Sequence, residues 1–402
     1  MEFKKVKLGE CVDYILDYRG KTPKKSKTGI PTLSAKSVKN NFIDYDEVYY
    51  ISRDEYNRFM SKGFPRIGDI LMTMEAPLGL VATLDRDDVG LGQRIVTIRG
   101  KKDFLDNNYL KFYLQSPKGQ HELYSRATGT TVVGISQKNL KNIDIVIPSL
   151  ENQIRIGRIL NNYNIKIEIN NKIISNLESQ AQAIFKSWFV DFEPFQDGNF
   201  VESELGMIPE GWEVKELGEI INLYDNKRVP ISKMDRDKME KNYPYYGANG
   251  IIDYVDNYLF DGKYLLMGED GTVRTEEGFP ILNYVDEKFW VSNHAHIMRG
   301  TLVSTEYIYL LLSKMFINNI VTGAVQEKIN QRNLKKIKII FPEKKELESF
   351  EKIIEPMFKM KLYLNNQNTK LAELRDALLP KLMAGEIDVS NIKIEGEEVK
   401  NE

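Results

Sequence analysis

The chain has 402 residues, of which 42% are hydrophobic and 10% aromatic, a composition that argues against disorder and predicts two or more globular domains. The formal net charge of −2 excludes a basic footprint over the whole molecule. Nucleic-acid binding would therefore need a locally basic face, or a partner that carries the positive charge.

The single cysteine, Cys11, cannot form an internal disulfide, which favours a reducing cytoplasm. We interpret it as a half-buried apolar residue in an early strand, since its sequence neighbours offer no activating base. The N-terminus lacks the apolar stretch of a signal peptide, and no window reaches the length of a membrane span. The expected location is the cytoplasm, with no membrane partner.

Residues 1–147 are predicted to form a mixed domain of strands and short helices. Strand-like runs lie at 47–51, 70–73 and 94–98, and a helix is expected near 107–116. The loop at 19–28 carries five cations within nine residues and suits contacts with DNA phosphates, although a solvated basic loop explains it equally well. The candidate DNA-binding residues in this block are Arg19, Lys21, Lys24, Lys25, Lys27, Thr130 and Thr131.

Residues 148–190 are predicted to form one long helix of about 60 Å, with Ser149 as its N-cap and Gly157 as its only glycine. Its residues form a seam with alternating steps of four and three, the pattern of a coiled coil. The polar Asn170 either fixes the register or merely frays the stripe. The seam holds Ile156, Leu160, Tyr163, Ile167, Asn170, Ile174, Leu177, Ala181, Ile184 and Trp188.

After a Gly- and Pro-containing linker at 191–206, residues 207–341 repeat the mixed character of the first block. Strands are expected at 264–267, 289–291 and 338–341, and a helix near 305–317. The Asn in the segment 245–250 could bond a base edge, but a hairpin with core tyrosines also explains that segment. The carboxylates in the segment 268–271 could accept from a base, but a plain turn explains them as well. The candidate DNA-binding residues are Tyr246, Asn249, Glu269, Asp270 and Arg274.

Residues 342–387 are predicted to form a second long helix, followed by a charged, frayed tail at 388–402. Pro356 should kink this helix or delay its start, Pro380 should disturb its end, and Gly385 should close it. Gln367 is interpreted as a simple break in the stripe. The seam holds Ile353, Met357, Met360, Leu364, Gln367, Leu371, Leu374 and Leu378.

The chain contains an internal repeat. Residues 136–189 align without a gap on residues 330–383 at an offset of 194, and Leu8-Gly9-Glu10 matches Leu217-Gly218-Glu219 at an offset of 209. The recurrence of Gln137 as Gln331 favours a shared structural role for both. Two similar halves predict near two-fold symmetry, and therefore an antiparallel coiled coil of the two long helices.

Several catalytic signatures are missing from the sequence. It has no Pro-Pro pair, hence no Asn/Asp-Pro-Pro-aromatic motif of amino-methyltransferases, and it has no Walker loop. His294 and His296 stand two apart on an expected strand, where a metal pair is conceivable, but a structural role is favoured since Cys partners and a third ligand are missing nearby. No catalytic residue, bound cofactor or metal is predicted.

Three motifs resemble the specificity subunit of type I restriction–modification systems, and the resemblance spans essentially the whole chain. They are the run from Ala181 to Phe192, the run from Ile208 to Gly218 and the run from Leu378 to Ile387. The resemblance implies an α+β fold with two target-recognition domains, at 1–147 and 207–341, separated by the two conserved helices. Each domain would read one part of a split, asymmetric DNA sequence.

The resemblance also implies partners. The long helices would set the unread gap and dock two modification subunits, which would bring S-adenosylmethionine and methylate adenine. Two restriction subunits would add cleavage driven by ATP and Mg²⁺. This chain would be the non-catalytic reader of double-stranded DNA. The alternatives are a stand-alone architectural protein with two DNA-binding modules, an enzyme with an unrecognised site, and a scaffold that binds proteins.

Overall fold

The computed structural model describes residues 2–20, 22–323 and 326–392. The chain divides into two compact units. The first unit consists of Met1–Ile169 with Gln367–Glu402, and the second unit of Asn170–Asn366. Each unit therefore combines one variable block with one half of each long helix.

The two predicted long helices are confirmed as α6 (Leu150–Phe189) and α11 (Lys344–Ala384). The hydroxyl of Ser149 caps the start of α6 by accepting from the Asn152 N–H at 3.5 Å. Gly157 has a packing reason, because a Cβ there would stand 2.9 Å from the Cβ of Asn108 at the start of another helix. Gly385, at φ +76°, closes α11 with paired bonds from the Gly385 and Glu386 N–H groups to the carbonyls of Leu382 and Lys381.

The prediction that Pro356 delays the second helix is wrong. The helix begins at Lys344 and continues through both Pro356 and Pro380. A proline inside a helix removes one backbone hydrogen bond, and here the packing of the preceding and following turns compensates for that loss. The buried side chains that anchor these turns are Leu347, Phe350, Ile354 and Phe358.

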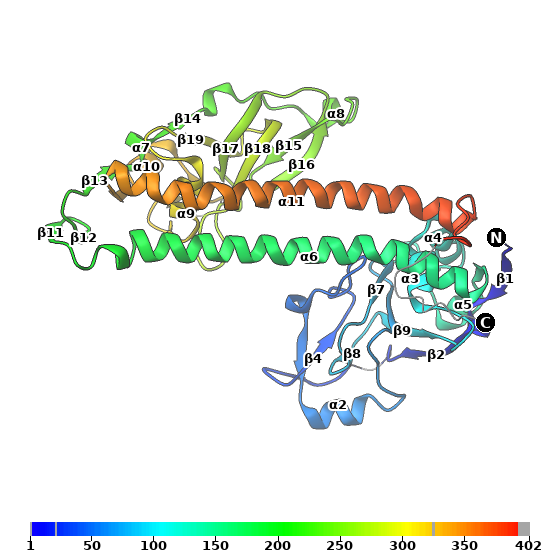
Figure 1. The fold of residues 1–402 in the computed structure, drawn as a ribbon. Coiled ribbons are helices and arrows are strands. Elements are labelled where there is room, and N and C mark those ends of the chain that lie inside the picture. Colours follow the sequence, from blue (N-terminus) through cyan, green and yellow to red (C-terminus); the bar gives the residue numbers. More distant parts are fainter. Residues whose placement is uncertain (1, 21, 324–325, 393–402) are drawn as a thin grey trace. The chain divides into compact units, whose positions relative to one another are not determined.

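Within each unit, half of α6 lies beside half of α11 (Figure 1). In the first unit, Arg375 donates to the Asn164 side-chain oxygen at 2.7 Å, and in the second unit Lys361 forms an ion pair with Glu178. The two residue numbers of either pair add up to 539, and a constant sum is the mark of antiparallel helices. The predicted antiparallel pairing is confirmed, in one common register.

The seam predicted for α6 is confirmed, since each of its ten residues is buried or half-buried. Asn170 is completely buried. In α11 the seam was only partly right: Met357, Leu364, Gln367, Leu371 and Leu378 face inward, whereas three others do not. These exposed residues are Ile353 at 42%, Met360 at 48% and Leu374 at 52%.

The first unit contains small, mostly antiparallel sheets, and α3 (Asn107–Gln115) packs on the central one. Its central sheet has the order β2-β9-β6-β7, and a second sheet has the order β3-β5-β4-β8. The strands are β1 (Lys4–Lys7), β2 (Val12–Asp17), β3 (Lys25–Ser26), β4 (Ile30–Leu33), β5 (Tyr49–Ile51), β6 (Ile70–Met74), β7 (Leu78–Thr83), β8 (Gly90–Leu91), β9 (Ile95–Gly100) and β10 (Asp144–Ile147). The remaining helices are α1 (Leu8–Cys11), η1 (Tyr45–Glu47), α2 (Arg53–Phe59), α4 (Pro117–Ser125) and α5 (Gln137–Lys141).

The second unit follows the same path with a continuous sheet of order β14-β19-β17-β18-β15-β16, packed on α9 (Thr305–Ser313). Its strands are β11 (Phe200–Ser203), β12 (Gly206–Pro209), β13 (Glu213–Glu216), β14 (Ile221–Leu223), β15 (Tyr243–Gly247), β16 (Gly250–Val255), β17 (Phe260–Gly268), β18 (Leu282–Val291), β19 (Ala295–Gly300), β20 (Val321–Thr322), β21 (Lys328–Ile329) and β22 (Lys338–Phe341). The shorter helices are η2 (Glu193–Phe195), α7 (Leu217–Ile220), η3 (Asp225–Lys227), α8 (Lys233–Arg236) and α10 (Gln331–Lys335).

The sequence repeat is a structural repeat. In the first unit β1 pairs with β10, and in the second unit β13 pairs with β22 in the same antiparallel sense. The amide of Asn139 in α5 donates to the Arg126 carbonyl at 2.9 Å. Its counterpart Asn333 in α10 donates to the Ile320 carbonyl at 3.4 Å. These donors and acceptors are all separated by the sequence offset of 194, so the two units share their framework bonds.

Two smaller expectations need correction. Cys11 lies in the short helix α1, not in a strand, and it is fully buried, so that burial raises the pKa of its thiol to about 11. The tail is not frayed where it leaves α11, because Val389 is buried and the Ser390 carbonyl accepts from Arg155 at 2.7 Å. Residues 393–402 of the predicted tail lie outside the described residues.

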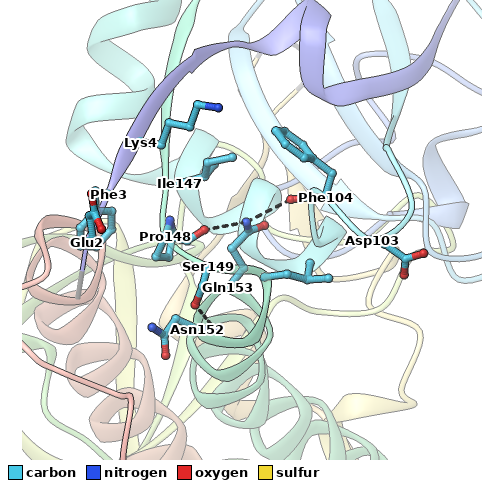
Figure 2. Close-up of a pocket in the computed structure, with 11 residues that line it drawn as sticks. Glu2, Phe3, Lys4, Asp103, Phe104, Ile147, Pro148, Ser149, Asn152 and Gln153 are labelled. Atoms are coloured by element: carbon cyan, nitrogen blue, oxygen red, sulfur yellow. Dashed lines mark hydrogen bonds between the residues drawn. The ribbon is translucent and has the colours of Figure 1, made fainter.

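The start of α6 is tied to the first unit by one amide side chain (Figure 2). The Gln153 amide nitrogen donates to the Phe104 carbonyl at 3.1 Å and to the Pro148 carbonyl at 3.0 Å. Its oxygen accepts from the Asp106 N–H at 3.0 Å. These bonds tie the first turns of the helix to the segment before α3. Across the part of the chain that the structure describes, no helix combines the length and apolarity needed to cross a membrane.

Candidate nucleic-acid interface

Three loops of the first unit meet at the end of its central sheet. They are the turn 75–77 between β6 and β7, the turn 92–94 before β9, and the loop 128–134. The Met74 N–H donates to the Arg94 carbonyl at 2.8 Å, and the Ile135 N–H donates to the Met74 carbonyl at 3.0 Å. A β-bridge joins Glu75 to Gly134. We call these three segments the first loop cluster.

Polar side chains are exposed on the first loop cluster beside the apolar Val132 and Val133. Arg94 forms an ion pair with Glu75 at 3.1 Å, and their side chains are 52% and 35% exposed. The backbone of Arg94 lies in the left-handed region at φ +67°, which residues other than glycine adopt rarely. The candidates Thr130 and Thr131 are exposed on the third loop. The cluster thus offers both donors and acceptors to a ligand.

The basic loop lies next to this cluster. The Gln93 amide in the turn 92–94 donates to the Thr22 hydroxyl at 2.6 Å. Lys24, Lys25 and Lys27 are all exposed, so they are available to phosphate oxygens. Lys21, the other predicted lysine, lies outside the described residues.

Arg19 has a structural role in this unit. Its guanidinium binds the Asp17 carboxylate through two nitrogens and also donates to the Ile135 carbonyl at 3.0 Å. Burial raises the pKa of Asp17, but the hydrogen bonds from Arg19 outweigh it and lower that pKa below its usual value. Arg19 therefore anchors the loop 128–134 to β2 from a half-buried position.

The second unit contains an equivalent set of loops. The Glu269 N–H donates to the His294 carbonyl at 2.9 Å, and the Ile329 N–H donates to the Glu269 carbonyl at 2.8 Å. A β-bridge joins Asp270 to Lys328, as Glu75 is joined to Gly134. We call residues 269–271, 292–294, 322–323 and 326–328 the second loop cluster. At its tip, His294 Nδ1 lies 2.5 Å from the Asp270 carboxylate.

The structure separates the candidates of the second unit into three kinds. Asn249 is exposed in the two-residue turn between β15 and β16, beside the end of β17, which confirms the predicted hairpin. Tyr246 is 8% exposed and donates to Glu287 at 2.8 Å, so it is a core residue and cannot reach DNA, whose base edges would require an exposed side chain. Asp270 is half-buried at the cluster tip.

The two remaining candidates are engaged in ion pairs. Glu269 contacts Arg228 and lies 3.4 Å from the Lys328 ammonium. Arg274 pairs with the Glu327 carboxylate in the loop that holds β20 and β21. Both side chains brace the second loop cluster.

A buried histidine takes the place of Arg19 in the second unit. His296 is completely buried, with Nδ1 2.5 Å from the Asp225 carboxylate and Nε2 2.8 Å from the Ile329 carbonyl. The Gln331 amide also donates to Asp225 at 2.6 Å. Burial works against a charged Asp225, yet the bond to His296 lowers the pKa of that carboxyl below its usual value.

This environment bears on the metal question. Among the described residues, Asp225, Glu269 and His296 place ligand-type atoms within 4.8 Å of one another. Both ring nitrogens of His296 are bonded to protein groups, and Glu269 is paired with cations. His294 and His296 contact different carboxylates and face different partners. The group is therefore built as a hydrogen-bonded network that joins β19 to the loop before α10.

The sequence prediction did not include four residues that the structure places in the loop clusters, Glu75, Gln93, Arg94 and His294. The gapless alignment begins at residue 136, whereas these positions correspond at other offsets: 195 for Glu75 with Asp270 and 200 for Arg94 with His294. Insertions between the strands hide that match. Aligning the strand ends in place of the whole blocks would have found it.

Known proteins place the chain in a family. Residues 1–179 and 209–374 match the family model described as type I restriction modification DNA specificity domain. The chain is 28% identical over 390 residues to the type I restriction enzyme MjaIX specificity subunit of Methanocaldococcus jannaschii, covering 90% of this chain and 88% of that protein. It is 25% identical over 329 residues to the MjaVIII specificity subunit of the same organism, covering 75% of each.

A solved structure supports the fold. The crystal structure of the type I restriction–modification S subunit from M. genitalium superposes with a TM-score of 0.58 at 17% identity, covering 95% of this chain and 96% of that one. The family model covers both variable blocks and most of both long helices. The chain belongs to the non-catalytic type I restriction–modification DNA specificity family, and is the DNA target specificity subunit of such a system.

Proposed function

We propose that this chain reads a bipartite, asymmetric DNA target, one part with each loop cluster. The observation that carries the proposal is the pair of clusters itself. The bonds that hold the loops are equivalent in the two units, whereas the side chains at the tips differ. Two loop clusters with the same backbone framework and different tip side chains are suited to recognise different bases in the two parts of one target.

The reading domains would be residues 1–147 and 207–341, with α6 and α11 as the spacer between them. Since both helices contribute one half to each unit, a change in their common length would change the gap between the two parts of the target. The stretch 191–206 would act as the connection between the halves. It includes the short helix η2 and strand β11.

The partners would be two modification subunits and two restriction subunits. The relatives of this chain are named specificity subunits of type I restriction enzymes, which supports such an assembly. The modification subunits would supply S-adenosylmethionine and methylate adenine, and the restriction subunits would use ATP and Mg²⁺. The complex would act in the cytoplasm.

The outer faces of the long helices would dock the modification subunits. Apolar side chains that neither core uses are exposed there, and exposed apolar stripes mark interaction surfaces. On α6, Ile165, Ile169 and Ile173 recur every four residues and are 45%, 45% and 38% exposed. On α11, Ile353, Met360 and Tyr363 are 42%, 48% and 60% exposed.

Mapping the methylated sequence tests this proposal. Cells that express the chain with its modification subunit should carry methylated adenines in one motif made of two unlike parts and a fixed gap. The same cells without the chain should lack that mark. A single uninterrupted motif, or a mark that does not depend on this chain, would contradict the proposal.

A further inference from the structure

The tips of the two loop clusters carry the same arrangement with different residues. A carboxylate leaves the end of the central strand, as Glu75 after β6 and Asp270 after β17. A nitrogen-bearing side chain from the turn before the neighbouring strand, β9 or β19, meets it, as Arg94 at 3.1 Å and His294 at 2.5 Å. In either unit, the carbonyl of that second residue accepts from the N–H of the residue just before the acid, Met74 or Glu269.

These pairs are more exposed than the ion pairs that stabilise the interior of a unit. The pair Arg99–Asp69 in the first unit is 16% and 1% exposed, and it joins β9 to the residue before β6. At the cluster tips, Arg94 and His294 are 52% and 51% exposed. An exposed pair contributes about 0–1 kcal/mol to stability, so stability alone does not account for a carboxylate with a nitrogen donor at both tips.

Phosphate binding does not account for the pairs either. A carboxylate beside the cation would repel a phosphate, whereas the neighbouring lysines 24, 25 and 27 are suited to that task. A base edge, in contrast to a phosphate, presents donors and acceptors side by side. Its partner must therefore offer both an acceptor and a donor. An acid next to a nitrogen donor matches such an edge.

We propose that Glu75–Arg94 and Asp270–His294 are the central base-reading pairs, one for each part of the target. This rests on the proposed function and names the residues that perform it. The carboxylates would accept from the amino group of cytosine or adenine, and Arg94 would donate its fork to guanine. His294 would offer one ring nitrogen to a base while Asp270 holds the other.

The test uses the full chain in complex with its modification subunit. Two readouts are combined: the methylated motif in cells, and binding of the complex to duplexes in which each target base is replaced in turn. The variants are Arg94→Gln and His294→Gln. The matched controls are Arg86→Gln, from an exposed pair with Asp88, and Lys338→Gln, from an exposed pair with Glu204.

The proposal predicts that Arg94→Gln reduces discrimination at one or two bases of one part of the target by about tenfold or more, and leaves the other part unchanged. His294→Gln should do the same in the other part only. The control variants should keep both parts. Arg94→Lys keeps the charge but loses the planar fork, so it should also lose discrimination if Arg94 reads a base.

Two results would overturn the pairs as readers. One is an unchanged motif in all variants of a complex that still binds and methylates. The other is uniform weakening on every sequence, which indicates phosphate contacts. Arg94→Gln could lower the Tm of the chain and thereby abolish binding. In that case Arg94→Lys is the deciding variant, because base discrimination retained by Arg94→Lys contradicts a reading role for Arg94. A wild-type complex without any bipartite motif would instead contradict the proposed function itself.

Discussion

In both units a side chain bonds the backbone carbonyl at the same repeat position. That side chain is Arg19 in the first unit and His296 in the second. Arg19 donates to the Ile135 carbonyl and binds Asp17, while His296 bonds the equivalent Ile329 carbonyl and binds Asp225. Sequence alone groups Arg19 with the lysines of its loop, because all five residues are cations. Only the fold distinguishes a cation that anchors a loop from cations that remain exposed.

The exposed lysines should bind DNA without regard to sequence. Replacing Lys24, Lys25 and Lys27 together with Ala should weaken binding by the complex to all duplexes, because each lost phosphate contact removes counterion release. The slope of log K against log salt should become less steep by about one per lysine that contacts phosphate. Binding titrations between low and physiological salt measure this slope. A changed base preference would show that the loop reads bases.

Arg19→Ala serves as the contrasting variant. It removes the partner of Asp17, whose lowered pKa contributes stability at pH values above its unfolded pKa, and that contribution is lost as the pH falls. The variant should therefore lower the Tm at pH 7. The triple lysine variant should leave the free energy of unfolding within about 0.5 kcal/mol of the wild type, and its Tm nearly unchanged. An unchanged Tm in Arg19→Ala would contradict its structural role.

A buried lysine should give the first unit a specific pH dependence. Lys111 is 2% exposed, and burial, reinforced by repulsion from Arg375, lowers its pKa to about 8. Its Nζ still bonds the Asn161 side-chain oxygen at 2.9 Å. Between pH 8 and the unfolded value of 10.5 the unfolded chain holds a proton that the folded chain lacks, so stability rises with pH there.

Lys111→Met should remove that rise, which amounts to about 3 kcal/mol over the window. Denaturant unfolding at a series of pH values between 7 and 10.5 measures the difference from the wild type. Lys118→Met, at an exposed position of α4, is the control and should keep the wild-type slope. Equal slopes for wild type and Lys111→Met would mean that the pKa of Lys111 is not lowered in the folded chain, and would contradict its burial as a destabilised cation.

At the scale of elements, the long helices could be predicted from sequence because their signals are local. The cap Ser149, the closing Gly385 and the repeated apolar steps each act within a turn or two. The seam of α11 could be predicted less well. Ile353 and Ile354 are adjacent and equally apolar, and a strict four-and-three pattern selects the first, whereas packing on the second unit buries the second.

The pairing of unlike helices depends on charges that the seam pattern does not include. Glu178 and Lys361 are 28% and 14% exposed, and the Lys361 ammonium also lies 4.7 Å from the Phe358 ring centre. If α6 faced a copy of itself in the same register, the offset of 194 would put Ile167 opposite Glu178. The ion pair therefore favours α6 with α11 over either helix with its own copy.

Charge reversal tests this pair. Lys361→Glu should destabilise the chain by about 1–3 kcal/mol, because two half-buried carboxylates would then face each other. Adding Glu178→Lys to it should recover much of that loss, and the double-mutant cycle gives the coupling. Lys359→Glu, in an exposed pair with Glu355, is the control and should cost at most about 0.5 kcal/mol. Purely additive effects of the two reversals would show that the pair does not set the register.

At the scale of the whole molecule, the repeat indicates two equivalent units, and the fold bears this out through β1–β10 and β13–β22. The residues of the loop clusters, which form the proposed interface, could be predicted only in part. Thr130 and Asp270 lie in the loop clusters, whereas Tyr246 is buried and Arg94 was missed. Loop tips depend on which strands end side by side, and that is a tertiary property without local sequence signal.

The spacer claim requires both helices to change together. Their common register means that an insertion into α6 alone would move its seam residues out of step with α11. Seven residues inserted after Lys172 and seven after Asn366 keep the two pairs Asn164–Arg375 and Glu178–Lys361 opposed. A heptad also preserves the seam and adds about 10 Å of helix, or about three base pairs.

The most direct test of the helical spacer is the methylated motif of this doubly extended chain, expressed with its modification subunit. The account predicts that both parts of the target keep their bases, while the unread gap between them grows by about three base pairs. An unchanged gap in a complex that still methylates, or new bases in either part, would contradict the account of two separate readers on a helical spacer.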